Sequence, residues 1–411
     1  MSRIVKKEKI VADSFALLEK RQNQLNLLLQ QLIQIRSYSG EEKQIVKFIV
    51  NKMNEFGFDQ AFIDGLGNAV GRIGAGPMKI LFDAHIDTVK VTEDEKWEHP
   101  PFEGKIVHGK IYGRGAVDEK PAMAGFLMAG QILKSMMNSN ELPFTLYVVG
   151  SVIEEDADGY PLFHLIQNEN IKPDYVLLGE PTDLQVYRGQ RGRMEIKITT
   201  TGKSAHGAHN QQGVNAVYKM TPIISAIEQL DKNLPIVEPL GKGSITVSQV
   251  VTRAPSLCSV PDFCEIHLDR RLTLGETRES ALLQLQNLVE KLEVGASISI
   301  PVFEGKSWKG TEFQQEAYYP TWLLDENDIL TRAGMKTALT VLDAAARLGS
   351  WAFSTNGVAT AGHFGIPTIG FAPGKEELSH SSREELNLAD LLTATKFYTL
   401  FPFVLSESIR S

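Results

Sequence analysis

The segment from Leu81 to Val89 reads Leu-Phe-Asp-Ala-His-Ile-Asp-Thr-Val and places a histidine and an aspartate at the end of an apolar run. The run with its β-branched residues favours a short buried strand. A histidine at the carboxyl end of such a strand opens into the crevice where α/β sheets bind their ligands. Asp87 could accept the second imidazole N–H of His85, which fixes the tautomer and makes the ring a better metal ligand.

Further acidic residues stand at the ends of similar segments. Asp118 follows a glycine-rich turn, Glu154 and Glu155 follow a strand-like apolar run, and Glu180 ends another such run. Ionised carboxylates are rarely buried without partners. A divalent cation is the simplest compensating charge for acidic groups that gather at one edge of a sheet.

A second histidine completes the pattern far downstream, where His380 follows an apolar strand and a Pro-Gly loop. The resulting set contains two imidazoles and three carboxylates: His85, Asp118, Glu155, Glu180 and His380. This mixture suits zinc, cobalt or manganese better than calcium, which prefers oxygen ligands. Two metal ions bridged by one carboxylate need about this many ligands, so we predict a dinuclear metal centre.

With these segments in this order, the chain resembles the M20 family of metallopeptidases and amidohydrolases, which includes acetylornithine deacetylase and succinyl-diaminopimelate desuccinylase. The resemblance extends from about Leu25 to the C-terminus. The run from Ser256 to Asp262, followed by Asp269 to Thr273, is similar to the YgeY-like branch of hydrolases linked to selenium metabolism. The bridging motif departs from many relatives by having Pro121-Ala122 in place of Gly-Gly.

The resemblance implies a role for each of the five candidate ligands. His85 and Glu180 would bind one metal ion, and Glu155 and His380 would bind the other. Asp118 would bridge the two ions. Zinc is the expected metal, with cobalt and manganese as alternatives.

Three further residues would take part in catalysis by the same resemblance. Asp87 would be the hydrogen-bond partner of His85, and Glu154 would be the general base. His206 matches a histidine that the smaller domain of the family supplies to the active site, often from the partner subunit, and it would stabilise the oxyanion of the reaction.

The implied reaction is hydrolysis of a linear amide or peptide bond in a small substrate that carries a carboxylate. An N-acyl amino acid, a dipeptide and a carbamoyl compound all remain candidates. The metal ions would activate a water molecule, because metal binding lowers the pKa of water from about 15.7 toward roughly 7. Glu154 would accept the proton and deliver it to the leaving amine.

The substrate carboxylate calls for a cationic partner, and an arginine is the natural clamp for it. The candidates are Arg191, Arg193, Arg270 and Arg271. We rank Arg271 first, together with the backbone near Asn356 and Gly374. Cys258 replaces an asparagine of many relatives at a position that can touch the substrate, so the substrate specificity of the better-known members is not carried over to this chain.

Two other interpretations compete with this one. The first is a metal-dependent aminopeptidase of a related fold. The second is a non-catalytic binding protein that kept the fold. Binding proteins of this kind usually lose the base or a ligand, whereas Glu154 and the five ligands are all present here.

The composition sets further limits. The length of 411 residues suggests two domains, and the net charge of −8 differs from the basic footprint of nucleic-acid-binding proteins. The chain has two cysteines, which fits a reducing compartment. Its start lacks the apolar core of a secretory signal, and we see no run of about 18 apolar residues. We therefore expect a cytoplasmic enzyme without membrane or nucleic-acid partners and, by the resemblance, a homodimer.

These residues need a scaffold that brings distant segments together. Strands and helices alternate up to residue 187, which predicts an α/β domain with a mostly parallel sheet flanked by helices. Residues 188–303 read as an α+β insertion that would serve as lid and dimerisation domain, with a strand expected at 296–303. Residues 304–411 return to the catalytic domain, with a helix expected at 328–348. His99, His108, His164 and His267 have no motif around them, and we expect them to be structural.

Overall fold

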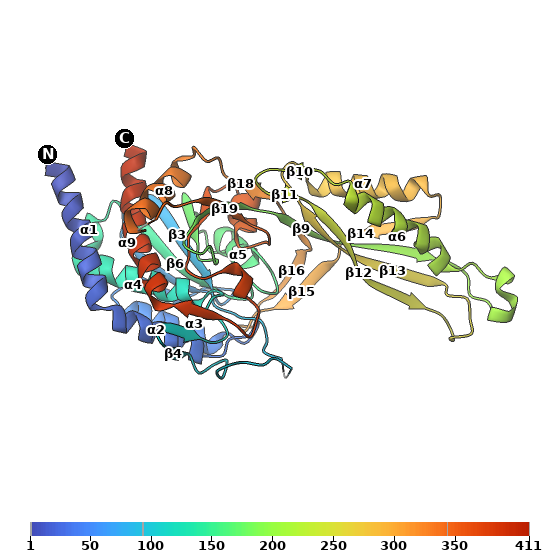
Figure 1. The fold of residues 1–411 in the computed structure, drawn as a ribbon, viewed down its shortest axis with the longest axis horizontal. Helices are drawn as coiled ribbons and strands as arrows, with labels where there is room; N and C mark the ends of the chain where they lie inside the picture. The colour runs from blue at the N-terminus through green and yellow to red at the C-terminus, as the bar shows by residue number, and fades with distance from the viewer. Residues whose placement is uncertain (1, 93, 343, 411) are drawn as a thin grey trace.

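Two separate sheets organise the chain in the computed structural model, which describes residues 2–92, 94–342 and 344–410. A nine-stranded sheet with helices on both faces forms the larger domain. A five-stranded antiparallel sheet forms a smaller domain that extends to one side (Figure 1). This is the predicted combination of an α/β domain with an α+β insertion.

The large sheet has a parallel centre and antiparallel edges. Its strands are β1 (Gln60–Ile63), β2 (Ala69–Ile73), β3 (Met78–His85), β6 (Phe144–Ser151), β7 (Tyr175–Leu178), β8 (Val186–Gln190), β18 (Trp322–Leu323), β19 (Leu348–Trp351) and β20 (Thr368–Gly370). Their order is β1-β2-β6-β3-β7-β20-β8-β18, and β19 pairs with β8. Strands β6, β3, β7 and β20 are parallel neighbours, so their carboxyl ends open at the same edge of the sheet.

Helices cover both faces of this sheet because successive side chains of a strand point to opposite sides. The helices of this domain are α1 (Ser2–Lys20), α2 (Gln22–Gln34), α3 (Lys43–Glu55), α4 (Lys120–Met136), α5 (Tyr160–Gln167), α8 (Ile329–Val341) and α9 (Leu388–Arg410). In β3, Ile80 and Phe82 belong to the core that contains α4 and α9. Leu81 belongs to the core on the other face, with Leu162 and Leu165 of α5.

Helix α9 is long and apolar enough to cross a membrane by length and composition alone, but 67% of its most apolar window is buried inside the protein. Its Phe397 stacks on Phe371 with ring centroids 3.8 Å apart, and Phe401 lies 6.3 Å from Phe82. Burial of this kind is typical of the core helix of a folded domain.

The smaller domain is a sheet with two helices on one face. Its main strands are β9 (Gly192–Thr201), β12 (Ser244–Arg253), β13 (Phe263–Leu272) and β14 (Ala296–Ser299), and β17 (Tyr318–Tyr319) also pairs with β9. The helices are α6 (Ala216–Lys232) and α7 (Arg278–Lys291). Every second residue of β13 is buried, which matches a sheet that faces helices on one side. Strand β12 lies at the edge of the sheet order.

Short elements connect and border the two domains. They are β4 (Lys105–Val107), β5 (Lys110–Tyr112), β10 (Ile236–Val237), β11 (Gly241–Lys242), β15 (Val302–Lys306), β16 (Glu312–Glu316), β21 (Glu385–Asn387), η1 (Ser139–Glu141), η2 (Gly207–Gln212), η3 (Val358–His363) and η4 (Glu376–Leu378). The chain changes from the large sheet to the small one at Arg191, between β8 and β9. The domain division at residues 188 and 303 stays a prediction.

Two expected elements differ from the structure. The strand expected at 296–303 is divided into β14 and β15, which pair with β9 and β16 respectively. Pro301 lies between them, and a proline cannot donate to a strand ladder. The helix expected at 328–348 ends at Val341, and Leu348–Trp351 instead form β19 alongside β8. Leu348 is the one residue of β19 that was expected to be helical, and it pairs with Val186 of β8.

Candidate metal centre

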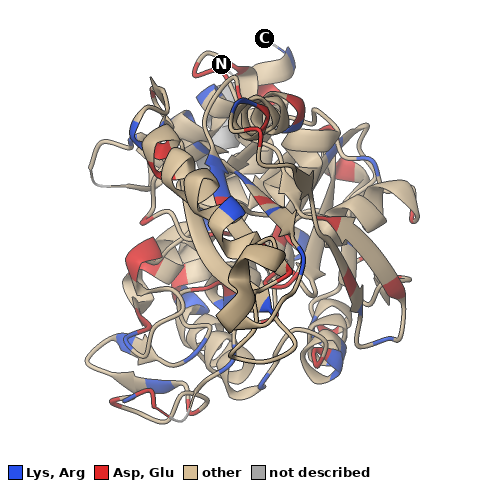
Figure 2. Cartoon of the chain, turned by 90° about the vertical axis from the view of Figure 1, so that its right-hand side faces the viewer, with Lys and Arg blue, Asp and Glu red and all other residues tan. Residues whose placement is uncertain are grey.

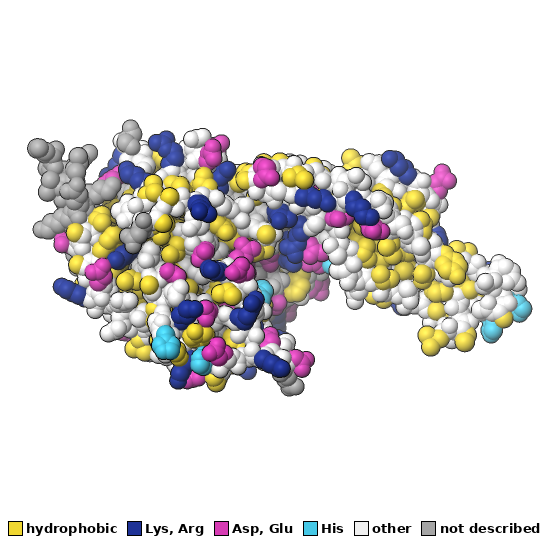
Figure 3. Space-filling model, in the orientation of Figure 1, with side chains coloured by type: hydrophobic (Ala, Val, Ile, Leu, Met, Phe, Trp, Pro, Cys, Tyr) yellow, Lys and Arg dark blue, Asp and Glu magenta, His cyan; other side chains and the backbone are white. Residues whose placement is uncertain are grey.

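The parallel strands and one helix deliver the five predicted metal ligands to a single cavity. His85 is the last residue of β3, Glu155 and Glu180 follow β6 and β7, Asp118 precedes α4, and His380 lies in the loop after β20. All five line a cavity of about 400 Å³, together with Glu154. In Figure 3 the surface is hollowed where the two domains meet.

Asp118 lies between the two histidines and presents one carboxylate oxygen to each. Its Oδ1 is 2.9 Å from Nε2 of His85, and its Oδ2 is 3.1 Å from Nε2 of His380. The same nitrogen of His380 lies 3.0 Å from Oε2 of Glu155. Potential ligand atoms of His85, Asp118 and Glu155 lie within 4.8 Å of one another, and those of His85 and Glu180 are equally close.

Asp87 connects the first histidine to the segment that carries Glu154. Nδ1 of His85 lies 3.1 Å from the main-chain oxygen of Asp87 and 3.5 Å from its Oδ1. The carboxylate of Asp87 also accepts the N–H groups of Glu154 (3.2 Å) and Glu155 (3.1 Å) and the hydroxyl of Ser39 (2.7 Å). One buried carboxylate therefore fixes the predicted ligand His85 and the predicted base Glu154 relative to each other.

The electrostatics of the cavity favour bound cations. Burial raises the pKa of Glu154 and of Glu180 well above the usual value. Hydrogen bonds to Asp118 and Glu155 raise the pKa of His380 to about 10. Six carboxylates and two arginines line the cavity, whereas acidic and basic residues are interspersed over the side of the molecule drawn in Figure 2. A donor set of two imidazoles and three carboxylates fits two divalent transition-metal ions.

Glu119, which the sequence pattern did not single out, lies in the same buried cluster. Its Oε1 accepts the main-chain N–H of His85, and its Oε2 has no hydrogen-bond partner among the described residues. A ligand atom of Glu119 lies within 4.8 Å of those of His85 and Glu180. In the sequence, the signal that could have pointed to Glu119 is its position directly after Asp118.

Two more buried glutamates hold the backbone around the site. Glu42 accepts the N–H of Ile153 at 2.9 Å, and Ile153 has a φ of 55°, which a β-branched residue rarely adopts. Burial raises the pKa of Glu42 to about 8. Glu384 accepts a hydrogen bond from Arg114 and another from the N–H of Val117 at 3.2 Å. These contacts fix the turns that precede Glu154 and Asp118.

Two arginines line the cavity. Arg271 lines it and is held by Asp269 through two hydrogen bonds of 2.7 and 2.9 Å. Arg193 also lines it, lies 3.3 Å from Asp158 and covers the ring of Tyr319 at 4.3 Å. The remaining lining residues are Asp158, Phe353, Ser354, Glu376 and Ser379.

Two predicted substrate-binding positions, Asn356 and Gly374, are not among the residues that line the cavity, and their part in substrate binding stays a prediction. The side chain of Asn356 is buried and donates to Asp83 (2.8 Å) and Ser151 (2.9 Å), while its oxygen accepts the N–H of Gly159. Gly374 has a φ of 98°, and its carbonyl accepts the N–H of Asp183 at 2.8 Å. The amide of Asn356 is therefore already used to hold the strand ends together, a long-range role that its sequence position does not reveal.

His206 and Cys258 are neighbours in the smaller domain, away from the cavity within this chain. The N–H of Gly207 donates to the carbonyl of Cys258 at 2.7 Å, and both His206 and Cys258 are exposed. Neither residue lines the cavity that contains His85 and Asp118. A single chain therefore does not bring His206 to the predicted metal ligands.

Comparison with known proteins agrees with this geometry. The sequence profile described as Peptidase family M20/M25/M40 matches residues 81–402. The uncharacterized protein YgeY of Escherichia coli (strain K12) is 40% identical over 381 residues, which cover 93% of this chain and 94% of YgeY. Succinyl-diaminopimelate desuccinylase 1 of Alteromonas mediterranea is 25% identical over 61% of this chain and 66% of its own length.

A solved structure supports the same fold. The YXEP protein of Bacillus subtilis, described as a dinuclear metal binding peptidase from the M20 family, superimposes with a TM-score of 0.72 at 14% identity and covers 95% of this chain and 99% of its own. The chain described here belongs to peptidase family M20/M25/M40 and is a metallohydrolase of the peptidase and deacylase type.

Proposed function

We propose that this chain hydrolyses a linear amide or peptide bond in a small, carboxylate-bearing substrate and that it uses two divalent metal ions, with zinc as the first choice. His85 and Glu180 would hold one ion, Glu155 and His380 the other, and Asp118 both. The observation that carries this proposal is Asp118 itself, whose Oδ1 faces His85 at 2.9 Å while its Oδ2 faces His380 at 3.1 Å.

The residues around the ions would perform the proton transfers. Bound divalent ions would lower the pKa of water and polarise the scissile carbonyl. Glu154 lines the same cavity, and its Oε1 has no hydrogen-bond partner among the described residues, so it can receive a proton from the attacking water. Glu154 would then return that proton to the leaving amine. Asp87 would keep the ring of His85 and the backbone of Glu154 in place.

A substrate screen tests this function. Dipeptides, N-acyl amino acids and N-carbamoyl amino acids would be incubated with the purified chain and zinc, cobalt or manganese. We expect turnover of at least one of these three substrate classes, and turnover about 10²- to 10⁴-fold slower in the Glu154→Gln variant. Turnover confined to longer peptides with a free amino end would favour the aminopeptidase alternative. Binding without turnover of any class would favour the binding protein.

Replacement of Arg271 tests the substrate clamp. We expect the Arg271→Ala variant to raise KM about 10- to 100-fold with a smaller change in kcat, because a charged hydrogen bond to the substrate contributes about 1.5–3 kcal/mol. The measurement is a steady-state titration of the substrate that the screen identifies. Arg332→Ala, which removes an exposed arginine of α8 that does not line the cavity, is the matched control. An unchanged KM for Arg271→Ala would rule out the clamp.

We also propose a homodimer that forms through the smaller domain. The edge strand β12 exposes Val250 (52%) and Val251 (38%), and Tyr218 on α6 is 76% exposed. Figure 3 shows apolar side chains over the part of the molecule that carries α6, β12 and β13. Exposed edge strands readily pair with another chain. Such a dimer offers a route by which His206 of one subunit reaches the cavity of the other.

Mixing two inactive variants tests this role of His206. We expect His206→Ala and Glu154→Gln each to be nearly inactive alone. After both are unfolded together and refolded, or co-expressed, mixed dimers would contain one complete site, and activity would recover to about a quarter of the unmodified level. Sedimentation measurements would confirm the dimer. Failure to recover activity in verified mixed dimers would mean that His206 does not act across the interface.

A further inference from the structure

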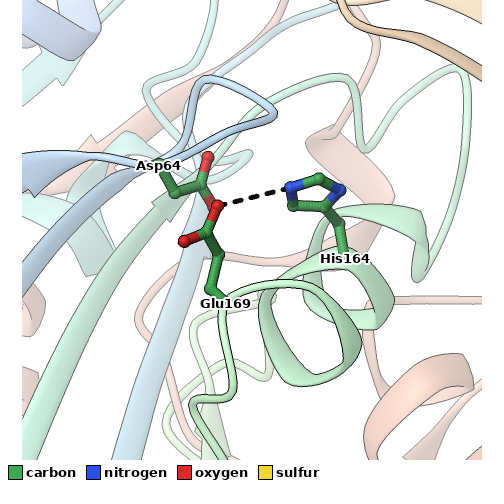
Figure 4. Close-up of side chains that lie close together, drawn as sticks. All are labelled: Asp64, His164 and Glu169. Carbon is green, nitrogen blue, oxygen red and sulfur yellow. Dashed lines mark ion pairs between the residues drawn. The ribbon is translucent and has the colours of Figure 1, made fainter.

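A second group of potential metal ligands lies outside the cavity, where the loop between β1 and β2 meets α5. It consists of Asp64, His164 and Glu169 (Figure 4), whose ligand atoms lie within 4.8 Å of one another. Asp64 is 2% exposed and His164 is 8% exposed. Glu169 is more open to solvent, which leaves a path by which an ion can enter.

The imidazole of His164 faces the carboxylates without a hydrogen bond. Its Nε2 is buried and has no hydrogen-bond partner among the described residues. It lies 3.6 Å from Oε1 of Glu169, which is too long for a hydrogen bond. Ligands held about 2.0–2.2 Å from one divalent ion are about 3–3.6 Å apart, so this spacing fits two groups that share an ion.

The two carboxylates are held in place by the main chain. Oδ1 of Asp64 accepts three N–H groups of the loop, from Leu66, Gly67 and Asn68, at 2.7–3.0 Å. Its Oδ2 accepts only the side-chain amide of Asn68, so this oxygen keeps a lone pair for a cation. Oε1 of Glu169 accepts the N–H of Gly65 at 2.7 Å.

Gly65 makes this close approach possible. A Cβ at this position would lie 2.8 Å from Oε1 of Glu169 and 3.1 Å from Nε2 of His164. A larger residue would therefore push both groups apart. Lys309 donates to the main-chain oxygen of Asp64 at 2.6 Å and not to its carboxylate, so its bond leaves the carboxylate available.

We propose that Asp64, His164 and Glu169 bind a further divalent transition-metal ion with a structural role. One imidazole and two carboxylates suit zinc, cobalt or manganese. The ion would join the β1–β2 loop to α5. Asn68 in the same loop accepts the N–H of Val152 at 3.0 Å, so the ion would also stabilise the end of β6 that leads to Glu154. This site is independent of the ions proposed for the cavity.

Zinc counting after equilibrium dialysis against buffered Zn²⁺ tests this site. We expect the His164→Gln and Glu169→Gln variants to contain one zinc fewer per chain than the unmodified protein, whatever the total. The exposed His108→Asn variant is the matched control and should lose none. The Asp118→Asn variant should lose zinc from the cavity but keep the ion held by Asp64, His164 and Glu169. The zinc lost in His164→Gln and Glu169→Gln is therefore distinct from the cavity ions. Equal zinc counts in Glu169→Gln and the unmodified chain would overturn the proposal.

A stability measurement guards against variants that simply misfold. Chelation should lower the melting temperature of the Asp118→Asn variant. It should lower the melting temperature of the double variant Asp118→Asn/Glu169→Gln by less. An anomalous difference map at the zinc edge should show a peak among the three side chains. The same response to chelation in both proteins, or a map without that peak, would show that His164 and Glu169 form only an ion pair.

Discussion

Glu154→Gln is expected to lose about 10²- to 10⁴-fold in kcat while it binds the same number of metal ions as the unmodified chain. Glutamine has nearly the same shape as glutamate but cannot accept the proton of the attacking water. Glu154 Oε1 has no hydrogen-bond partner among the described residues, so a substitution at this oxygen breaks no hydrogen bond there. The measurement combines steady-state kinetics with elemental analysis of the same sample.

The matched control is Asp156→Asn, which neutralises a neighbouring carboxylate that does not line the metal cavity. It should keep activity within a few-fold. The unmodified enzyme should lose activity as the pH falls, because the base works only when ionised and burial raises the pKa of Glu154. Activity of Glu154→Gln within a few-fold of the unmodified chain would exclude Glu154 as the base.

Asp118→Asn is expected to weaken the binding of both metal ions and to abolish most of the hydrolytic activity. Each oxygen of Asp118 faces a different histidine, and an asparagine offers one neutral oxygen in place of two charged ones. We expect metal affinity to fall by more than about 100-fold. Even residues that only hydrogen-bond to a metal ligand change metal affinity or activity by about 10- to 100-fold when they are replaced. Calorimetric titration of the metal-free chain with Zn²⁺ measures the effect.

The control for this experiment is Asp13→Asn, which neutralises an exposed carboxylate on α1. Circular dichroism would show that both variants keep their secondary structure. If Asp118→Asn still bound two ions in the cavity with unchanged affinity, Asp118 would not be the bridge, and the pairing of ligands on either side of it would have to be abandoned.

Much of this site can be predicted because its signals are local. The apolar run before His85 predicts a strand, and β3 ends at that residue. The runs before Glu154 and Glu180 form β6 and β7, which lie on either side of β3. The rule that parallel strands open at one edge then brings their terminal residues together. The roles assigned to these residues stay predictions until the variants are measured.

Other residues could not be found in this way because their contacts join distant parts of the chain. Glu42 bonds to Ile153, and Glu384 bonds to Arg114 and Val117, but no motif surrounds Glu42 or Glu384 themselves. His164 likewise had no motif around it, and only the fold places it beside Asp64.

The same limit applies to elements decided by tertiary pairing. The helix expected at 328–348 ends at Val341, and Leu348, its last expected residue, instead begins β19, for which β8 offers a partner. Local propensity is a weak guide where a distant strand can satisfy the backbone. His206 is a further case, because its place in the smaller domain makes its role depend on a second chain.

The central claim is that five side chains from distant segments hold two cations around Asp118. Anomalous diffraction at the zinc edge from crystals of the unmodified chain grown with Zn²⁺ tests it most directly. We predict two peaks in the cavity, about 3.5–4 Å apart, one beside His85 and Glu180 and the other beside His380 and Glu155. A cavity with one peak or none at full zinc saturation would contradict the account.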